Sequence, residues 1–242
     1  MKPYHRIPIL ECGESLVPIS PDLFALEQPH PYEKLSAPYG TKSPYFLRQG
    51  VLKQLTAAQA ILQVMRPGWR IKIFDAYRPI AVQQFMVDYT FNEIIRVQSL
   101  TVEQLTTTQR QTILEQVYQF WAAPSTNPMT PPPHSTGAAV DVTLVDEGGT
   151  DVDMGSPIDE LSPRSFPDYF VSERAIADGV SKSDRQKFHE NRQLLNTVMT
   201  NVGFRRHPQE WWHFSLGDQM WAWIVNQEVL ETLLVARYGA IQ

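Results

Sequence analysis

The apolar residues of this chain change their spacing from segment to segment, and this change limits the possible folds more than any other feature. Between 47 and 65 they recur every three or four residues, which predicts a helix with one buried face that ends at Pro67-Gly68. The next segment, RIKIFDAY at 70–77, alternates as a strand does. A second strand pattern, AAVDVTLVD at 138–146, ends at Gly148-Gly149. The chain therefore combines helices with at least two strands.

Three further helices and a short strand region are expected. The helices fall at about 79–95, 101–121 and 183–202. Thr101 and Gln104 have the spacing of a capping box at the start of the second of them. The apolar and aromatic segment 203–217 is expected to return as one or two strands. Helices packed on one side of a small, mainly antiparallel sheet predict an α+β fold.

The length of the chain favours one domain over 1–242. Its first 45 residues are rich in proline and lack periodicity, so we expect them to wrap over the surface as irregular structure with short strands. The core is expected from about 45 to 217, and a helical segment over 218–242. The stretch AAPSTNPMTPPP at 122–133 predicts a loop.

Composition excludes several classes of function. The formal net charge is −5 and the basic residues are scattered, so no nucleic-acid partner is expected. No stretch approaches the roughly 18 to 20 apolar residues of a membrane span, and the first residues lack the apolar run of a secretory signal. Cys12 is the only cysteine, so no intrachain disulfide can form, which favours the cytoplasm.

Two local patterns combine residues that can carry chemistry. In the first, His134 and Asp141 stand at the two ends of HSTGAAVD, and Gly137 permits a tight turn that would bring them together. The second is Glu210-Trp-Trp-His213. Residues three apart in a strand face opposite sides, so Glu210 and His213 can share a site only if the chain bends or begins the strand between them.

Two imidazoles and one carboxylate are typical of a catalytic zinc site, because they leave a fourth coordination position for water. We expect His134, Asp141 and His213 to hold one Zn²⁺ per chain. Glu210 is the candidate that takes a proton from the attacking water. The oxyanion that forms on a peptide carbonyl needs a fixed positive partner, and Arg78 in Asp75-Ala-Tyr-Arg-Pro79 is the candidate for that role.

Four motifs in one order resemble the D-alanyl-D-alanine dipeptidases, which are zinc enzymes of peptidase family M15 related to D,D-carboxypeptidases. The motifs are DAYRP at 75–79, HSTGAAVD at 134–141, MGSPID at 154–159 and EWWH at 210–213. The resemblance runs from about residue 45 to about 217. It implies a fold of the Hedgehog and D,D-peptidase kind with the zinc site at the sheet.

The resemblance also implies roles for individual residues. His134, Asp141 and His213 would bind zinc, Glu210 would be the catalytic base and acid, and Arg78 would stabilise the tetrahedral intermediate. Asp159 matches the aspartate that receives the free ammonium group of the substrate, which would restrict cleavage to short, unblocked peptides.

Two further residues, Ser135 and Tyr45, are candidates for substrate contacts. Vancomycin-resistance members of the family have a serine two residues before the first zinc histidine and an arginine two after it. This chain has Pro132 and Thr136 at these positions, so the family pattern does not predict which residue binds the carboxylate of the substrate. No role is evident for the helix at 101–122.

Other interpretations of these residues stay open. Arg78 could be an ordinary ion-pairing partner of Asp75, and Asp159 could simply cap a turn. His207 could lie near the site without binding metal. For the whole chain, the alternatives to a dipeptidase are a D,D-carboxypeptidase acting on longer peptidoglycan peptides and a zinc-stabilised binding module without catalysis. The oligomeric state is not predicted.

Overall fold

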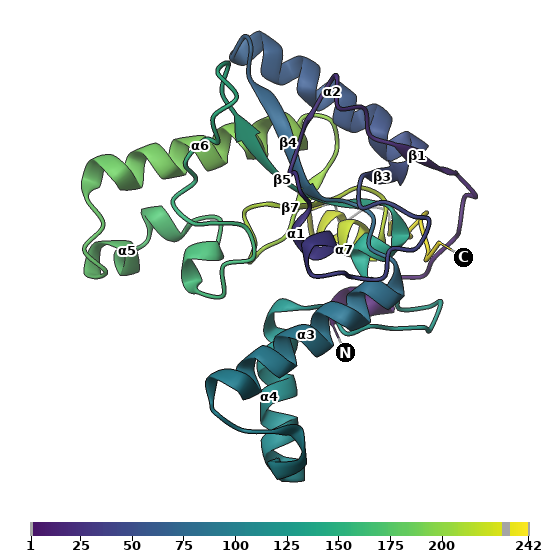
Figure 1. The fold of residues 1–242 in the computed structure, drawn as a ribbon. Coiled ribbons are helices and arrows are strands. Elements are labelled where there is room, and N and C mark those ends of the chain that lie inside the picture. The colour runs from purple at the N-terminus through teal and green to yellow at the C-terminus, as the bar shows by residue number, and fades with distance from the viewer. Residues whose placement is uncertain (1, 229–232, 242) are drawn as a thin grey trace.

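A five-stranded sheet lies at the centre of the computed structural model, which describes residues 2–228 and 233–241 (Figure 1). Its strands lie in the order β2 (Ala25–Leu26), β4 (Arg70–Asp75), β5 (Ala139–Val145), β7 (His213–Ser215) and β6 (Arg205–Arg206). Only the β2–β4 pair is parallel. β1 (Leu16–Pro18) and β3 (Phe46–Arg48) form a separate antiparallel pair. The predicted, mainly antiparallel sheet is confirmed.

The longer helices lie where the sequence pattern predicts them, but some begin or end at other residues than expected. They are α1 (Pro31–Lys34), α2 (Gln49–Met65), α3 (Ile80–Val97), α4 (Thr107–Phe120), α5 (Glu173–Ala177), α6 (Lys182–Thr200) and α7 (Gln219–Glu228). The capping box of Thr101 opens only a short 3-10 turn, and a second box at Thr106 opens α4, so that helix begins later than expected. In the C-terminal segment, the described residues 233–241 form no helix.

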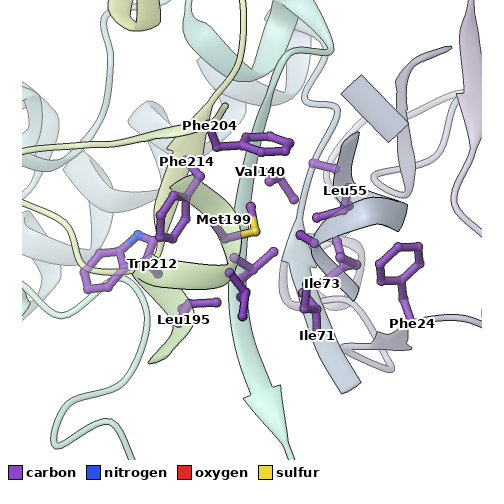
Figure 2. Close-up of a cluster of buried hydrophobic side chains, with 14 of the residues drawn as sticks. Phe24, Leu55, Ile71, Ile73, Val140, Leu195, Met199, Phe204, Trp212 and Phe214 are labelled. Atoms are coloured by element: carbon purple, nitrogen blue, oxygen red, sulfur yellow. The ribbon is translucent and has the colours of Figure 1, made fainter. Parts of the chain in front are cut away.

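The main core lies between one face of the sheet and helices α2 and α6 (Figure 2). Because side chains alternate along a strand, Ile71 and Ile73 of β4, alternate apolar residues of β5 and Phe214 of β7 point to this face. They meet the buried stripes of the two helices; the cluster includes Leu55, Ile71, Ile73, Val140, Val142, Leu195, Met199 and Phe214. Fully burying one such side chain contributes about 1.5–3 kcal/mol. The opposite face of β5 and β7 is thereby left for polar residues.

A smaller apolar cluster holds the α3–α4 hairpin, which projects away from the sheet (Figure 1). It joins the inner faces of α3 and α4 to Tyr32 and Tyr39 from the N-terminal wrap, and it includes Trp121 directly after α4. The predicted α+β domain with helices on one face of its sheet is thus confirmed by α2 and α6, and the hairpin stands apart from them with its own apolar cluster. In the described part of the chain no helix is long and apolar enough to cross a membrane.

Candidate active site

His134, Asp141 and His213 meet on the face of the sheet that α2 and α6 leave uncovered. Asp141 in β5 and His213 in β7 are direct partners across the two strands, so their side chains point the same way. His134 lies in a 3-10 turn, Pro133–Thr136, that leads into β5. Gly137 ends this turn with φ +70°, a left-handed conformation that glycine adopts without strain. The tight turn expected between His134 and Asp141 is present.

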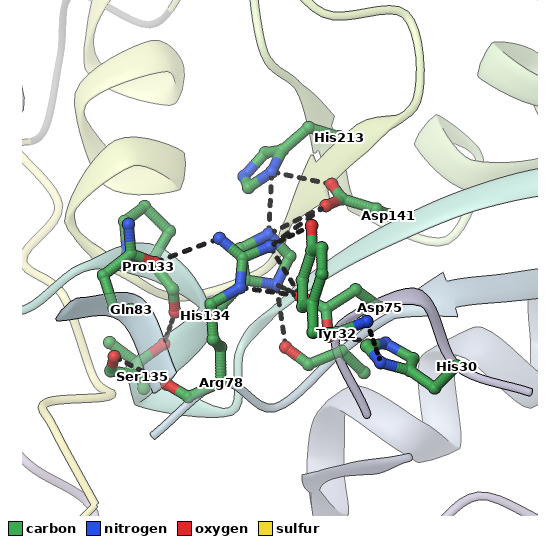
Figure 3. A network of polar contacts seen from close by, with 12 residues as sticks. His30, Tyr32, Asp75, Arg78, Gln83, Pro133, His134, Ser135, Asp141 and His213 are labelled. Atoms are coloured by element: carbon green, nitrogen blue, oxygen red, sulfur yellow. Dashed lines mark hydrogen bonds and ion pairs between the residues drawn. The ribbon is translucent and has the colours of Figure 1, made fainter. Parts of the chain in front are cut away.

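The three side chains point toward one small volume (Figure 3). Asp141 places Oδ2 3.2 Å from Nε2 of His134 and Oδ1 3.0 Å from Nδ1 of His213. Those two ring nitrogens lie 3.1 Å apart. One ligand atom from each residue lies within 4.8 Å of the others, and all three residues are buried. The donor set therefore fits a single divalent cation and leaves a further coordination position.

The second nitrogen of each imidazole fixes the orientation of its ring. Nδ1 of His134 donates to the carbonyl of Ala76 at 2.7 Å, so that Nε2 is the nitrogen that faces Asp141 and His213. Nε2 of His213 lies 3.4 Å from Oγ of Ser215, and that hydroxyl donates to Asp218 at 2.7 Å. Hydrogen bonds of this kind set the tautomer of a metal-binding histidine.

Asp141 is held in its charged form. Burial alone would favour the neutral carboxyl, but His134 and His213 outweigh it and hold the pKa of Asp141 well below its usual range. A deprotonated carboxylate is the form that binds a cation.

Glu210 lies beside the three residues, in the turn before β7. Because β7 begins only at His213, strand alternation does not separate the two side chains. Oε2 of Glu210 is 3.9 Å from Nδ1 of His213, and Oε1 is 3.9 Å from Nδ1 of His207. Burial raises the pKa of Glu210 to about 7. A carboxyl group with this pKa can both accept and donate a proton near neutral pH.

His207 lies close to the site, as one of the open interpretations allowed. Its ring centroid is 5.7 Å from that of His213. Burial, together with the nearby His213, lowers the pKa of His207 to about 3, so its imidazole is neutral. It is therefore a neutral neighbour of Glu210.

Arg78 follows β4 and is fixed on several sides. Its Nε and Nη2 donate to Asp75 at 2.9 and 2.6 Å, and its Nη1 donates to Gln83 at 3.0 Å. The guanidinium carbon lies 5.0 Å from the ring centroids of both Tyr32 and Trp121. Nη2 is also 3.8 Å from Oδ2 of Asp141. The ion pair with Asp75 therefore coexists with a position beside the candidate metal site.

Asp159 approaches the same region from a loop. Its backbone has φ +62°, which is uncommon for a residue with a side chain. The carboxylate accepts a hydrogen bond from the hydroxyl of Tyr32 at 2.9 Å. Burial, with the negative charge of Asp141 nearby, raises the pKa of Asp159 to about 6.

These residues line one cavity of about 550 Å³. Its wall contains the six principal candidates, namely Arg78, His134, Asp141, Asp159, Glu210 and His213. Tyr118 and Trp121 of the hairpin region and Lys2 and Tyr4 of the N-terminal wrap complete parts of the wall. The segment 101–122, for which the sequence suggested no role, thus contributes Tyr118, Trp121 and Ala122 to the wall of the cavity.

The structure does not bring Ser135 and Tyr45 into this cavity. Ser135 donates its hydroxyl hydrogen bond to the carbonyl of Arg78 at 2.8 Å, and Tyr45 donates to the carbonyl of Glu27. Thr136 likewise bonds to the carbonyl of Pro133, whereas Pro132 does line the cavity. The predicted substrate contacts of Ser135 and Tyr45 have no support in this geometry.

Several residues at the site carried no signal in the sequence. Tyr32, Gln83 and Trp121 contact Arg78 from three separate segments, and none belongs to a recognisable motif. Ser215 and Asp218 follow the EWWH motif closely. Their spacing of three residues is the one feature of the sequence that suggests a hydrogen bond between them.

Comparisons with known proteins agree with the motifs. The family model Peptidase_M15, described as D-ala-D-ala dipeptidase, matches residues 26–233. A D-alanyl-D-alanine dipeptidase of Synechocystis is 52% identical over 242 residues, covering 100% of this chain and 98% of that protein. One of Escherichia coli is 42% identical over 83 residues, covering 34% of this chain and 37% of that protein.

Among solved structures, a mutant of the vancomycin-resistance D,D-pentapeptidase VanY in complex with Zn(II) matches with a TM-score of 0.36 and 14% sequence identity. The match covers 78% of this chain and 82% of that one.

Proposed function

This chain belongs to the D-ala-D-ala dipeptidase family of peptidases, and from that membership we propose that it hydrolyses free D-alanyl-D-alanine with one zinc ion. The observation that carries the proposal is the convergence of His134, Asp141 and His213 on one point of a cavity that also contains Glu210 and Arg78. Two imidazoles and one carboxylate suit zinc and leave room for water and substrate.

In this proposal zinc, when bound, acidifies water and polarises the scissile carbonyl. Glu210 takes the proton from the attacking water and delivers it to the leaving amine. Its raised pKa of about 7 suits both transfers. Arg78 stabilises the negative charge that develops on the carbonyl oxygen, because Asp75 and Gln83 hold its guanidinium in place before the substrate arrives.

Asp159 is proposed to receive the ammonium group of the substrate. Its carboxylate lines the same cavity, and above a pH of about 6 it carries a negative charge. A charge-assisted contact to an ammonium group would favour a peptide with a free N-terminus. We therefore propose a dipeptidase rather than a carboxypeptidase that acts on longer chains.

The test is the release of free alanine from a panel of D,D, L,D and L,L dipeptides, with and without a chelator. Zinc-dependent cleavage of D-alanyl-D-alanine is expected, and it would also exclude a binding module without catalysis. N-acetyl-D-alanyl-D-alanine is expected to be a poor substrate. A zinc-loaded, folded protein that cleaves no free dipeptide would contradict the proposal, and preferential cleavage of the acetylated peptide would favour the carboxypeptidase.

The role of Glu210 has its own test. Glu210→Ala is expected to retain zinc while kcat falls by about 10²- to 10⁴-fold, the usual contribution of general acid–base catalysis. Glu93→Gln is a suitable control, since Glu93 is a surface carboxylate whose one ion pair within residues 2–228 and 233–241 is with Arg96 on α3. If Glu210→Ala keeps normal turnover, another group is the base.

We also propose a cytoplasmic location. The support is the single cysteine, Cys12, which is an exposed free thiol and so suits a reducing compartment. Cell fractionation tests this directly. Recovery of the protein only outside the cytoplasm would overturn it.

A further inference from the structure

Tyr32 stands between the two charged groups that would recognise opposite ends of the reacting residue. Its side chain is buried, with 2% of the residue exposed. The hydroxyl lies 3.2 Å from Nη2 of Arg78 and 2.9 Å from Oδ2 of Asp159. Figure 3 shows the ring beside Arg78 and close to Asp141.

The direction of both hydrogen bonds follows from the chemistry of the partners. A guanidinium group can only donate, so the tyrosine oxygen accepts from Arg78. Its single proton is then available to the Asp159 carboxylate, which can only accept while it is ionised. Burial raises the pKa of Tyr32 well above its ordinary value, so the hydroxyl keeps this proton. One hydroxyl therefore links the positive and the negative group.

The tyrosine ring is itself held rigidly. It meets His30 edge-on at 5.0 Å between centroids, Trp121 at 5.7 Å and Phe74 at 6.4 Å. Aromatic contacts of this geometry fix a ring well. In contrast, Asp159 belongs to a loop and has an uncommon backbone conformation. Its position therefore depends on the hydroxyl more than the position of Arg78 does.

We propose that Tyr32 is a specificity-determining residue that holds Asp159 at a fixed distance from Arg78, so that only a substrate whose ammonium group is on the same residue as the scissile carbonyl fits both. This inference rests on the proposed function. In a free dipeptide the nitrogen and the carbonyl carbon are separated by one Cα, so their spacing is set by covalent geometry. An acylated or longer peptide has no charge at that place.

The hydroxyl also keeps the two charges from pairing directly with each other. No ion pair within 4.0 Å joins Arg78 and Asp159 in the described part of the chain, although both line the cavity. Without the hydroxyl, Asp159 would lose its hydrogen-bond donor. A displaced or protonated Asp159 would no longer attract an ammonium group.

The pH dependence of binding provides a second readout. The ionisable groups around Asp159 are Tyr32, Arg78, Asp141, Asp75 and Glu210, and the Tyr32 hydrogen bond lowers the pKa of Asp159. Removing this bond raises that pKa above about 6. Since the neutral carboxyl does not attract an ammonium group, KM for the free dipeptide rises as pH falls, and in the variant this rise begins at a higher pH.

The experiment compares Tyr32→Phe with wild type on D-alanyl-D-alanine and on N-acetyl-D-alanyl-D-alanine, from pH 5 to 8. For the free dipeptide, KM is expected to rise by about 10- to 100-fold with a smaller change in kcat, the range expected for one hydrogen bond to a charged group. The acetylated peptide is expected to change by less than about threefold, because it makes no charged contact with Asp159.

Tyr238→Phe is the matched control. Tyr238 is also buried and donates to a carboxylate, that of Glu14 at 2.8 Å, but it lies outside the cavity. It should change neither KM nor the pH profile. A phosphinate analogue of the free dipeptide measures binding without turnover, and its affinity should fall in Tyr32→Phe and not in Tyr238→Phe.

Equal losses on the two substrates, or a pH profile that does not move, would overturn the proposal. A double-mutant cycle keeps it testable if Tyr32→Phe is destabilised. In a chain that carries Asp159→Asn, the added Tyr32→Phe change is expected to alter KM by less than about twofold, because the group it positions is gone. If the wild type cleaves neither peptide, the proposed function is contradicted, and this inference is contradicted with it.

Discussion

The two ends of the cavity are built in different ways. One end, called the metal end here, holds the candidate metal ligands. There Asp141 and His213 are paired residues of adjacent strands, and strand register alone places them side by side. The other end, called the ammonium end, is the proposed site for the substrate's ammonium group: Asp159 comes from a loop, Tyr32 from the four-residue helix α1 and Trp121 from the end of α4. The metal end is therefore positioned by backbone pairing, whereas the proposed ammonium end depends on side-chain hydrogen bonds and aromatic contacts.

The largest effect is expected from a change at the metal end. Asp141→Asn keeps the shape of the side chain but removes the charge that contacts both histidines and that we propose binds the cation. Zinc affinity should fall by more than the roughly 10- to 100-fold typical of changes around the ligands, and turnover should be lost. Chelator competition and a dipeptide assay measure both. Unchanged zinc affinity would show that Asp141 is not a ligand.

The next effect is expected where the two ends meet. Arg78→Lys keeps a positive charge but cannot donate to Asp75, Gln83 and Tyr32 together. We expect kcat to fall by about 10²- to 10³-fold, the usual loss when one oxyanion-stabilising donor is removed, while zinc stays bound. If lysine restores normal turnover, charge alone suffices and the fork geometry of Arg78 is irrelevant.

A smaller effect is expected behind the metal end. Asp218→Asn weakens the acceptor for Ser215, whose hydroxyl faces Nε2 of His213. Asp218 also accepts from the backbone N–H of Trp221 at the start of α7, and asparagine preserves that cap. We expect zinc affinity to fall by about 10- to 100-fold with little change in melting temperature. A loss of stability with unchanged zinc affinity would show that Asp218 acts only as the cap of α7.

Local patterns in the sequence predicted the metal end because its residues are near one another in the chain or on regular strands. The spacing of His134 and Asp141 around Gly137 fixed their turn, and the strand pattern at 138–146 became β5. The face of α2 that carries Val51, Leu55 and Leu62 is buried as its period predicted. The family assignment drawn from the four motifs is confirmed.

The other end could not be predicted in the same way. The contact of Tyr32 with Asp159 joins residues 127 positions apart, and no periodicity encodes it. The bond that the Tyr45 hydroxyl donates to the carbonyl of Glu27 likewise joins two segments of the irregular N-terminal part, which has no periodicity to predict it. The delayed start of α4 has a local cause, since two capping boxes follow each other and the residue between them, Leu105, has an extended backbone.

The most direct test of the central claim is anomalous X-ray diffraction at the zinc edge from crystals of the zinc-loaded protein. We expect one peak per chain between His134, Asp141 and His213, with solvent in the remaining coordination position and Glu210 beside it. A peak elsewhere, or an ion closed off by a fourth protein ligand, would contradict it.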